Sequence, residues 1–230
     1  MELSGCSIPE DRLYDLENDV WFYPEPGATT ARVGILGTLA SFAGKIQNVT
    51  FRPLEGYVAK GRSVGTLESI RFTGPVRLPV GATIVEQNLA VVKDPKLIND
   101  SPYDLGWMVR IQPAEESDRA ALETAYAIAP RLDQRIKEMR IRCYPATPDA
   151  ELYEIGLECS AVLVQLNDEL ARHDPGYVTL LVTDDPTSPI EMVRWSDQTG
   201  HSVLHHRVEG NLHHFLVRKE SNPVPRTRGK

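Results

Sequence analysis

The chain has 230 residues, and its 41% hydrophobic and 25% charged content is that of a globular protein with one large domain or two small ones. Its formal net charge of -7 at pH 7 lacks the basic surface that nucleic-acid binding requires, so we expect no nucleic-acid partner. No apolar run is long enough to span a membrane and the first residues lack a secretory signal, which together predict a cytoplasmic protein.

The region from Trp21 to about Ile111 has the pattern of a mostly β domain. Short apolar runs alternate there with glycine and proline turn signals, as in a sandwich or a flattened barrel. The clearest runs are residues 31–36, 46–51, 66–70 and 83–85.

The pattern becomes helical after Pro113. Residues 115–129 have apolar side chains at helical spacing and acidic residues in the first turn. Pro130 should end this helix and could open a second, charged helix that runs to about Arg140. Because further prolines follow, we assign residues 130–150 to a helical, proline-containing linker.

Residues 151–220 alternate strands and helices. The predicted elements are a strand at 152–155, a helix at 160–172, a strand at 177–183, a helix at 189–198, and a hairpin of 202–208 with 212–218 around Gly210 and Asn211. The wholly apolar strand 177–183 should be central. The order β-α-β-α-β-β predicts an α/β two-layer sandwich with both helices on one face of the sheet. The basic, proline-rich residues 221–230 are predicted to be a disordered tail.

Four ordered stretches between residues 8 and 129 resemble the H protein of the glycine cleavage system: IPEDRLYDLENDVW, VGILGTLASFAGKI, LESIRFTGPVRLPVGATIVEQN and PKLINDSPYDLGW. The resemblance implies that residues 1–129 form a lipoyl/biotinyl-type flattened barrel, a hybrid-motif sandwich with a C-terminal helix. It also implies a hairpin tip at which the family carries lipoate on a lysine, just after Glu68, Ser69 and Ile70. The segment 102–107 should pack its aromatic side chains structurally.

The residue at the position of that lysine is Arg71. A guanidinium stays protonated and cannot form an amide with lipoate, so we expect no lipoate and no other cofactor. Arg71 is then either a solvated turn residue or part of an anion-binding site. Arg71, Glu68 and Ser69 are retained as candidate binding residues.

Residues 151–219 resemble the TusA/SirA sulfur-carrier family. The stretch LYEIGLECSAVLVQLNDEL places Gly156, Leu157 and Cys159 where that family has a glycine, an apolar residue and its active cysteine. TDDP, Trp195, TGH and FLVRK also match. Ser160 and Val162 stand where the family has two prolines.

Cys159 should lie at a strand-to-helix junction. Free backbone N–H groups and the helix dipole would lower the pKa of its thiol there and favour the reactive thiolate, which can hold sulfane sulfur as a persulfide. Ser160 can cap the helix in place of the missing proline, and it is a further candidate binding residue. The alternative is a buried, inert cysteine.

The remaining cysteines and histidines carry weaker signals. Three scattered cysteines indicate reduced thiols, with Cys143 either a resolving thiol for Cys159 or incidental, and Cys6 in a mobile terminus without a role. The predicted hairpin register leaves two of its histidines on each face, so we predict no metal site. Asp184 and Asp185 are expected to be turn and capping acceptors.

The favoured function is a sulfur-relay carrier, enzymatic only in the sense of a sulfurtransferase, with Cys159 as the catalytic residue and a non-lipoylated domain that docks a partner. Its partners would be a sulfur donor and acceptor, or an enzyme that handles lipoyl groups. The alternative is a non-catalytic adaptor in which both carrier domains have lost their function. A component related to the glycine cleavage H protein is a third possibility.

Overall fold

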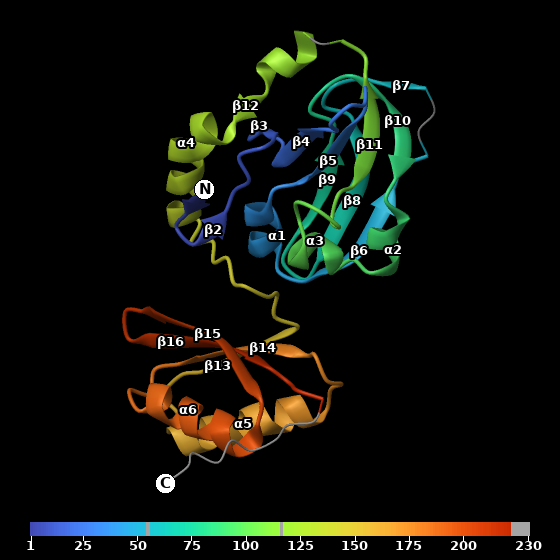
Figure 1. Cartoon of the computed structure of the whole chain (residues 1–230). Coiled ribbons are helices and arrows are strands. Elements are labelled where there is room, and N and C mark those ends of the chain that lie inside the picture. Colours follow the sequence, from blue (N-terminus) through green and yellow to red (C-terminus); the bar gives the residue numbers. More distant parts are fainter. Residues whose placement is uncertain (54–55, 116, 222–230) are drawn as a thin grey trace. The chain divides into compact units, whose positions relative to one another are not determined.

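The computed structural model describes residues 1–53, 56–115 and 117–221. The chain divides into two compact units, Met1–Cys143 and Tyr144–Lys230 (Figure 1). The first is mostly β and the second is α/β, as the sequence predicts. The tail predicted to be disordered lies, from residue 222 onward, outside the described residues.

The N-terminal unit is built from short antiparallel strands and a few short helices. In the described ranges its strands are β1 (Glu2–Leu3), β2 (Cys6–Ser7), β3 (Leu13–Asp15), β4 (Val20–Pro24), β5 (Ala31–Ile35), β6 (Ile46–Phe51), β7 (Tyr57–Val58), β8 (Ser63–Ser69), β9 (Thr73–Arg77), β10 (Ala82–Gln87), β11 (Val109–Pro113) and β12 (Glu123–Thr124). Its helices are α1 (Gly37–Ala43), α2 (Leu89–Lys93), α3 (Leu97–Asp100), the 3-10 helix η1 (Ser117–Ala121) and α4 (Ala125–Glu138).

The sheets of this unit are open, which corrects the predicted flattened barrel. One sheet has the order β12-β3-β4-β5-β11-β10-β7, another has the order β6-β8-β9, and β1 pairs with β2. The edge strands β12 and β7 are only two residues long, so they offer too few backbone groups to close the sheet. Side chains from both larger sheets form one apolar core, with Phe22 and Val33 from one and Val49, Leu67 and Val76 from the other.

Helix α4 differs from the prediction for this region. It begins at Ala125, where the Thr124 hydroxyl accepts a 3.3 Å hydrogen bond from the Ala127 amide, and it continues through Pro130 to Glu138. The prediction that Pro130 ends the helix is therefore wrong, and residues 130–138 belong to a helix packed on the N-terminal unit. A proline inside a helix costs about 3 kcal/mol. Burial of Leu132 and Ile136 beyond it offsets that cost, at about 1.5–3 kcal/mol each.

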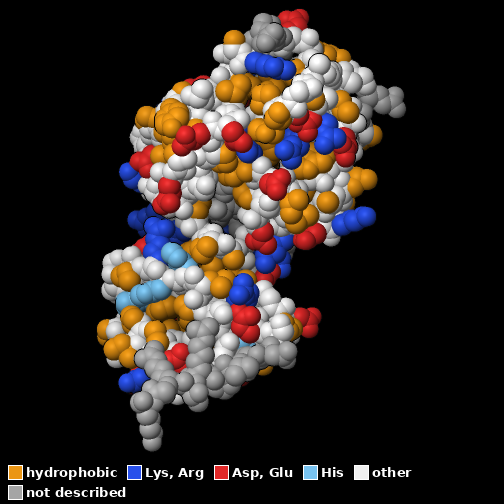
Figure 2. Space-filling view, viewed as in Figure 1, with side chains coloured by type: hydrophobic (Ala, Val, Ile, Leu, Met, Phe, Trp, Pro, Cys, Tyr) orange, Lys and Arg blue, Asp and Glu red, His pale blue; other side chains and the backbone are white. Residues whose placement is uncertain are grey.

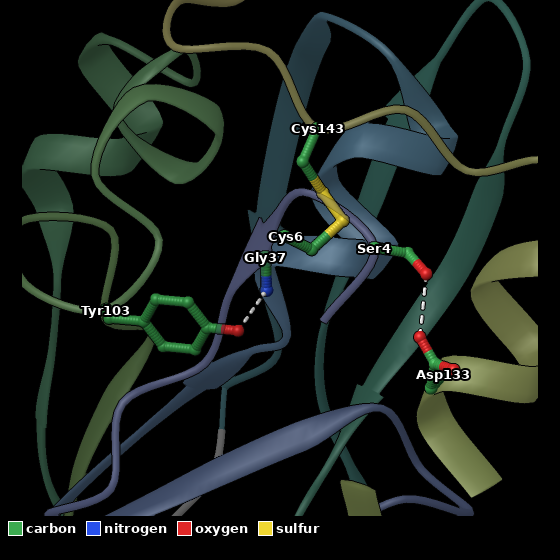
Figure 3. Close-up of a disulfide and its surroundings, with 6 residues drawn as sticks. All are labelled: Ser4, Cys6, Gly37, Tyr103, Asp133 and Cys143. Carbon is green, nitrogen blue, oxygen red and sulfur yellow. Dashed lines mark hydrogen bonds between the residues drawn. A yellow bond between two sulfur atoms is a disulfide. The ribbon is translucent and has the colours of Figure 1, made fainter. Parts of the chain in front are cut away.

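Cys6 and Cys143 form a disulfide, with an S–S distance of 2.04 Å (Figure 3). The prediction of three reduced thiols is therefore wrong, as is the mobile terminus around Cys6, whose side chain is buried beside α4. The Ser4 hydroxyl also donates a 2.7 Å hydrogen bond to Asp133 of α4. The disulfide and this hydrogen bond fasten the start of the chain to the end of the unit.

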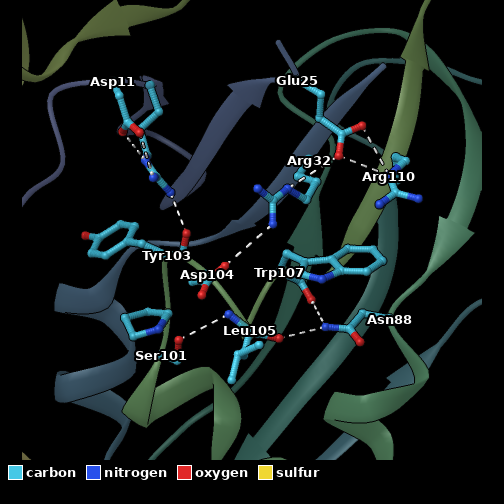
Figure 4. A network of polar contacts seen from close by, with 12 residues as sticks. Asp11, Glu25, Arg32, Asn88, Ser101, Tyr103, Asp104, Leu105, Trp107 and Arg110 are labelled. Atoms are coloured by element: carbon cyan, nitrogen blue, oxygen red, sulfur yellow. Dashed lines mark hydrogen bonds and ion pairs between the residues drawn. The ribbon is translucent and has the colours of Figure 1, made fainter. Parts of the chain in front are cut away.

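A polar network braces the segment 102–107, whose predicted structural role is confirmed (Figure 4). The Tyr103 hydroxyl accepts a 3.0 Å hydrogen bond from the Gly37 amide, and the Trp107 carbonyl accepts a 2.7 Å bond from the Asn88 amide group. Glu25 forms ion pairs with Arg32 and Arg110 beside this segment. These contacts satisfy polar groups at the edge of the core, which would otherwise be costly to bury.

The C-terminal unit contains β13 (Ala150–Glu154), α5 (Cys159–Ala171), β14 (Val178–Thr183), α6 (Ser188–Thr199), β15 (Ser202–Glu209) and β16 (Leu212–Arg218). The sheet order is β13-β14-β16-β15, with β13 parallel to β14 and the other pairs antiparallel. Both helices cover the same face of this sheet (Figure 1). All residues of β14 are buried, which confirms its predicted central position.

The hairpin register also agrees with the prediction. His206 pairs with Phe215 and Val208 pairs with His213 across the turn. His206 and His213 therefore share one face, with 3.1 Å between their ring nitrogens. His205 and His214 lie on the other face, where both contact Tyr144. Histidines gather on this unit (Figure 2). In the described ranges, no helix is both long enough and apolar enough to cross a bilayer.

Candidate functional sites

The hairpin between β8 and β9 ends in a tight turn that Ser69 organises. The Ser69 hydroxyl accepts hydrogen bonds of 3.2 Å from the Arg71 amide and 3.0 Å from the Phe72 amide, and it donates a 2.7 Å bond to the Ala43 carbonyl in α1. The Ser69 amide in turn donates to the Phe72 carbonyl at 2.8 Å. One serine thus closes the turn and fastens it to a neighbouring helix.

The turn presents Ile70 and Arg71 outward. Ile70 is 88% exposed, and Arg71 is exposed beside the backbone of Gly44. Glu68, on the strand just before the turn, accepts a 3.1 Å hydrogen bond from Asn48. One end of the hairpin therefore brings together Glu68, Ser69 and Arg71. The binding roles of these residues stay predictions. A guanidinium at this tip offers planar donors for an anion but no amine that an acyl group could modify.

The second site begins where β13 ends and α5 starts. Gly156 turns the chain with a φ of +76°, a conformation that a side chain would disfavour. Its amide donates a 2.8 Å hydrogen bond to Asp184. The Cys159 amide donates a 2.6 Å bond to Asp185, whose other oxygen accepts from Thr187. The predicted role as a turn and capping acceptor is confirmed for Asp185, whereas Asp184 accepts its bond from the loop before α5.

Ser160 does not cap α5, so that prediction is wrong. The residue at the N-cap is Glu158, which makes no side-chain capping bond, and Cys159 is already the first helical residue. Ser160 follows it with an exposed side chain. Because Asp185 accepts the bond from the Cys159 amide, the capping function comes from the loop after β14 rather than from the helix itself.

Cys159 is buried, with only 7% of the residue exposed. Burial, and then the nearby carboxylates of Asp185 and Glu191, raise its pKa above the ordinary value. The predicted lowering of this pKa is therefore wrong. The causes of this shift are the removal of water from the thiol and the adjacent negative charges, which disfavour the thiolate.

The sequence predicts Asp185 as a turn residue but does not predict its effect on the pKa of the Cys159 thiol. A signal for it was present, because the parallel strands β13 and β14 end at the same edge of the sheet. Residues that follow each strand must meet there, which brings the segment before Cys159 and the two aspartates together. Glu191, in the first turn of α6, had no such signal.

Cys159 is the sole free thiol, since the chain has three cysteines and the other two are joined. The disulfide also excludes the predicted alternative of Cys143 as a resolving thiol for Cys159. Within the part of the chain that the structure describes, no group of three or more histidine, cysteine or acidic residues is placed to hold a metal ion.

Two protein-family models match the chain. The model described as "Glycine cleavage H-protein" matches residues 12–135, and the model described as "Sulfurtransferase TusA" matches residues 153–219. The first match covers the whole β8–β9 hairpin and most of α4. The second begins within β13 and extends just past β16.

Curated relatives resemble the N-terminal part. The glycine cleavage system H protein 2 of Aquifex aeolicus is 37% identical over 143 residues, which cover 62% of this chain and 88% of that protein. A probable glycine cleavage system H protein 2 of Saccharolobus solfataricus is 35% identical, over 61% of this chain and 95% of that protein. A crystal structure of a glycine cleavage system H protein from Mycobacterium marinum is 33% identical, with a TM-score of 0.47, over 54% of this chain and 98% of that one.

Proposed function

Since the chain belongs to the glycine cleavage H-protein family and carries a TusA domain as well, we propose that it is a sulfur carrier that holds sulfane sulfur as a persulfide on Cys159. The observation that carries the proposal is the position of the single free thiol. It lies at the first residue of α5, in the domain that matches a sulfurtransferase model.

The loading step conserves electrons. The Cys159 thiol loses its proton, and the thiolate attacks the terminal sulfur of a donor persulfide. The S–S bond of the donor breaks, the donor leaves as a thiolate, and Cys159 becomes a persulfide. Delivery to an acceptor thiolate follows the same exchange in the opposite direction, so neither step needs an added oxidant.

The environment of the thiol supports a loading step that takes place in a complex with the donor. A buried thiol with a raised pKa is mostly protonated at neutral pH and reacts slowly with small electrophiles. Ile155 and Leu157, in the loop just before it, are exposed apolar residues. A donor protein that covers this loop would contact both side chains, and its approach would give access to the sulfur.

The N-terminal domain is proposed to dock a partner protein without carrying lipoate. Arg71 removes the acyl acceptor, while Ser69 keeps the turn in place and Ile70 remains exposed beside it. An apolar side chain next to a guanidinium is a suitable contact for a protein surface with a carboxylate. The partner would be the sulfur donor, the sulfur acceptor or an enzyme that handles lipoyl groups.

Intact-mass measurement tests the proposal. The chain is incubated with a cysteine desulfurase and cysteine, then worked up without reductant, and a gain of about 32 Da, the mass of one sulfur atom, is expected. Cys159→Ala should abolish the gain, whereas Ser160→Ala, at the exposed neighbouring position, should retain it. Absence of the adduct, or its persistence in Cys159→Ala, would overturn the proposal.

A second candidate function is a non-catalytic adaptor. The burial of Cys159 and the two carboxylates that raise its pKa favour it. An adaptor would show slow alkylation of Cys159 both alone and with the desulfurase, and no sulfur adduct. A sulfur carrier would show slow alkylation alone but acquire sulfur from its donor.

A third candidate function is a lipoylated component of the glycine cleavage system. It would show the mass of an acyl group on the purified chain.

A further inference from the structure

Three arginines lie at the end of the β6-β8-β9 sheet that is opposite the hairpin tip. Arg52 follows the last residue of β6, Arg62 precedes the first residue of β8, and Arg77 is the last residue of β9. Ser63 pairs with Arg77, and the Arg52 amide donates a 2.9 Å hydrogen bond to the Val64 carbonyl. The arginines therefore lie at the ends of three neighbouring strands, which together span about 10 Å.

These arginines line a groove of about 650 Å³ on the sheet. The full lining is Arg52, Pro53, Arg62, Ser63, Thr66, Thr73, Gly74, Pro75 and Arg77. The groove therefore has a cationic end, and hydroxyl and proline side chains along the rest of its length. Its volume falls within the range of about 300–1,000 Å³ that is usual for small-molecule sites.

Among the described residues, the groove offers no ion-pair partner to two of its three arginines. No acidic residue is among the lining residues, and no ion pair is formed by the guanidinium of Arg52 or Arg62 with any residue that the structure describes. Arg77 donates a 2.8 Å hydrogen bond to the Gly61 carbonyl, which orients its side chain. Several other arginines of this acidic chain do form ion pairs, as Arg135 does with Asp19.

We propose that this groove binds a small phosphorylated ligand, a nucleoside polyphosphate or a molecule of similar charge and size. Several guanidinium groups at one end suit a chain of phosphates, because each guanidinium presents two parallel N–H donors to a phosphate group. Thr66, Thr73 and Pro75 would contact the uncharged part of the ligand. The site lies in the N-terminal unit, and it depends neither on Cys159 nor on the proposed sulfur chemistry.

Calorimetric titration of the full-length chain with ATP, without magnesium and at low salt, tests this inference. We expect saturable binding that weakens as salt is added. The double variant Arg62→Gln/Arg77→Gln should weaken binding at least about tenfold, the effect of one lost charge-assisted hydrogen bond. The matched control Arg131→Gln/Arg194→Gln removes the same charge from exposed arginines outside the groove and should bind as the unmodified chain does.

A parallel titration with inorganic pyrophosphate identifies the source of the phosphate. Tighter binding of ATP supports a nucleoside phosphate, and equal binding supports recognition of the phosphate chain alone. Either result supports an anion groove if the double variant weakens it. Absence of binding for both probes, or equal binding by the unmodified chain and the double variant with an unchanged circular dichroism spectrum, would overturn the inference.

Discussion

The backbone amide of Cys159 donates a 2.6 Å hydrogen bond to Oδ2 of Asp185. Hydrogen bonds from Thr187, among others, lower the pKa of the Asp185 carboxyl, so it is ionised at neutral pH. This negative charge in turn raises the pKa of the Cys159 thiol, as the second cause after burial. The residue that accepts the hydrogen bond at the start of α5 therefore also disfavours the thiolate form of Cys159.

We predict that Asp185→Asn makes Cys159 more reactive. The single amide oxygen of asparagine can accept the bond from the Cys159 amide, while the Thr187 amide loses its acceptor. The charge that disfavours the thiolate is gone. The pKa of the thiol should fall, and alkylation by iodoacetamide at pH 7 should become several-fold faster. The measurement is the alkylation rate as a function of pH, followed by intact mass.

Asp184→Asn is the matched control for this change. Asp184 accepts a bond from Gly156 in the same loop, but it is not among the causes that raise the pKa of Cys159. Its substitution should leave the alkylation rate near that of the unmodified chain. Equal acceleration in both variants would indicate a general loosening of the loop and would contradict the electrostatic explanation.

Local patterns predicted the C-terminal unit well. A wholly apolar segment identified β14 as the central strand, and Gly210 with Asn211 fixed the register that places His206 opposite Phe215. Both features depend on residues close in sequence, where side-chain alternation and turn geometry decide the structure. The hairpin tip was placed differently, because the family resemblance and not a local turn signal implied it, and the structure shows Ser69 and Arg71 in that turn.

Features that depend on distant residues were not predicted. Cys6 and Cys143 are 137 positions apart, and nothing near either cysteine indicates that the fold brings them together. Pro130 should end a helix by local rules, but the apolar residues after it are buried against strands from the start of the chain. The raised pKa of Cys159 has the same origin, because its burial and its carboxylate neighbours come from the tertiary fold.

We predict that the Cys6–Cys143 disulfide stabilises the N-terminal unit. Cross-linking residues so far apart removes conformational entropy from the unfolded chain, and such disulfides contribute about 2–5 kcal/mol. Cys143→Ser should lower the free energy of unfolding by that amount. Urea unfolding followed by tryptophan fluorescence measures it, since Trp21 and Trp107 lie in this unit.

Thiol counting checks the disulfide directly. In denaturant without reductant the chain should show one reactive thiol, and after reduction it should show three. Cys159→Ser is the control for stability, because it removes the free thiol from the other unit. A count of three thiols before reduction, in protein purified without reductant, would contradict the disulfide.

Ionisation of Tyr103 should lower the stability of the N-terminal unit at alkaline pH. Burial raises its pKa to about 12, whereas in the unfolded chain it is near 10. Because the pKa of Tyr103 is higher in the folded state, the contribution of Tyr103 to the free energy of unfolding is complete below about pH 10. It is lost as the pH rises through about 12. Tyr103→Phe should therefore reduce the loss of stability between pH 10 and 12.

At pH 7, Tyr103→Phe should lower the free energy of unfolding by about 1 kcal/mol. The reason is that the Gly37 amide loses the hydroxyl that accepts its 3.0 Å hydrogen bond. Urea unfolding at each pH measures both effects. Tyr57→Phe, at a position that is 63% exposed, is the control and should change neither. An unchanged alkaline profile in Tyr103→Phe would show that other groups control the stability there.

Arg71→Lys should convert the hairpin tip into a lipoylation site. Ser69 holds the turn through backbone contacts that do not involve the side chain of residue 71, so the lysine would be presented on an intact turn. Its amine can lose a proton and attack an activated acyl group, which the guanidinium cannot do. With a lipoate–protein ligase, ATP and lipoate, intact mass should show one lipoyl group on Arg71→Lys and none on the unmodified chain.

Arg62→Lys, which places a lysine outside the tip, is the control and should stay unmodified. Lipoylation of the unmodified chain would show that another lysine serves as the attachment site and that Arg71 does not decide the chemistry of this domain.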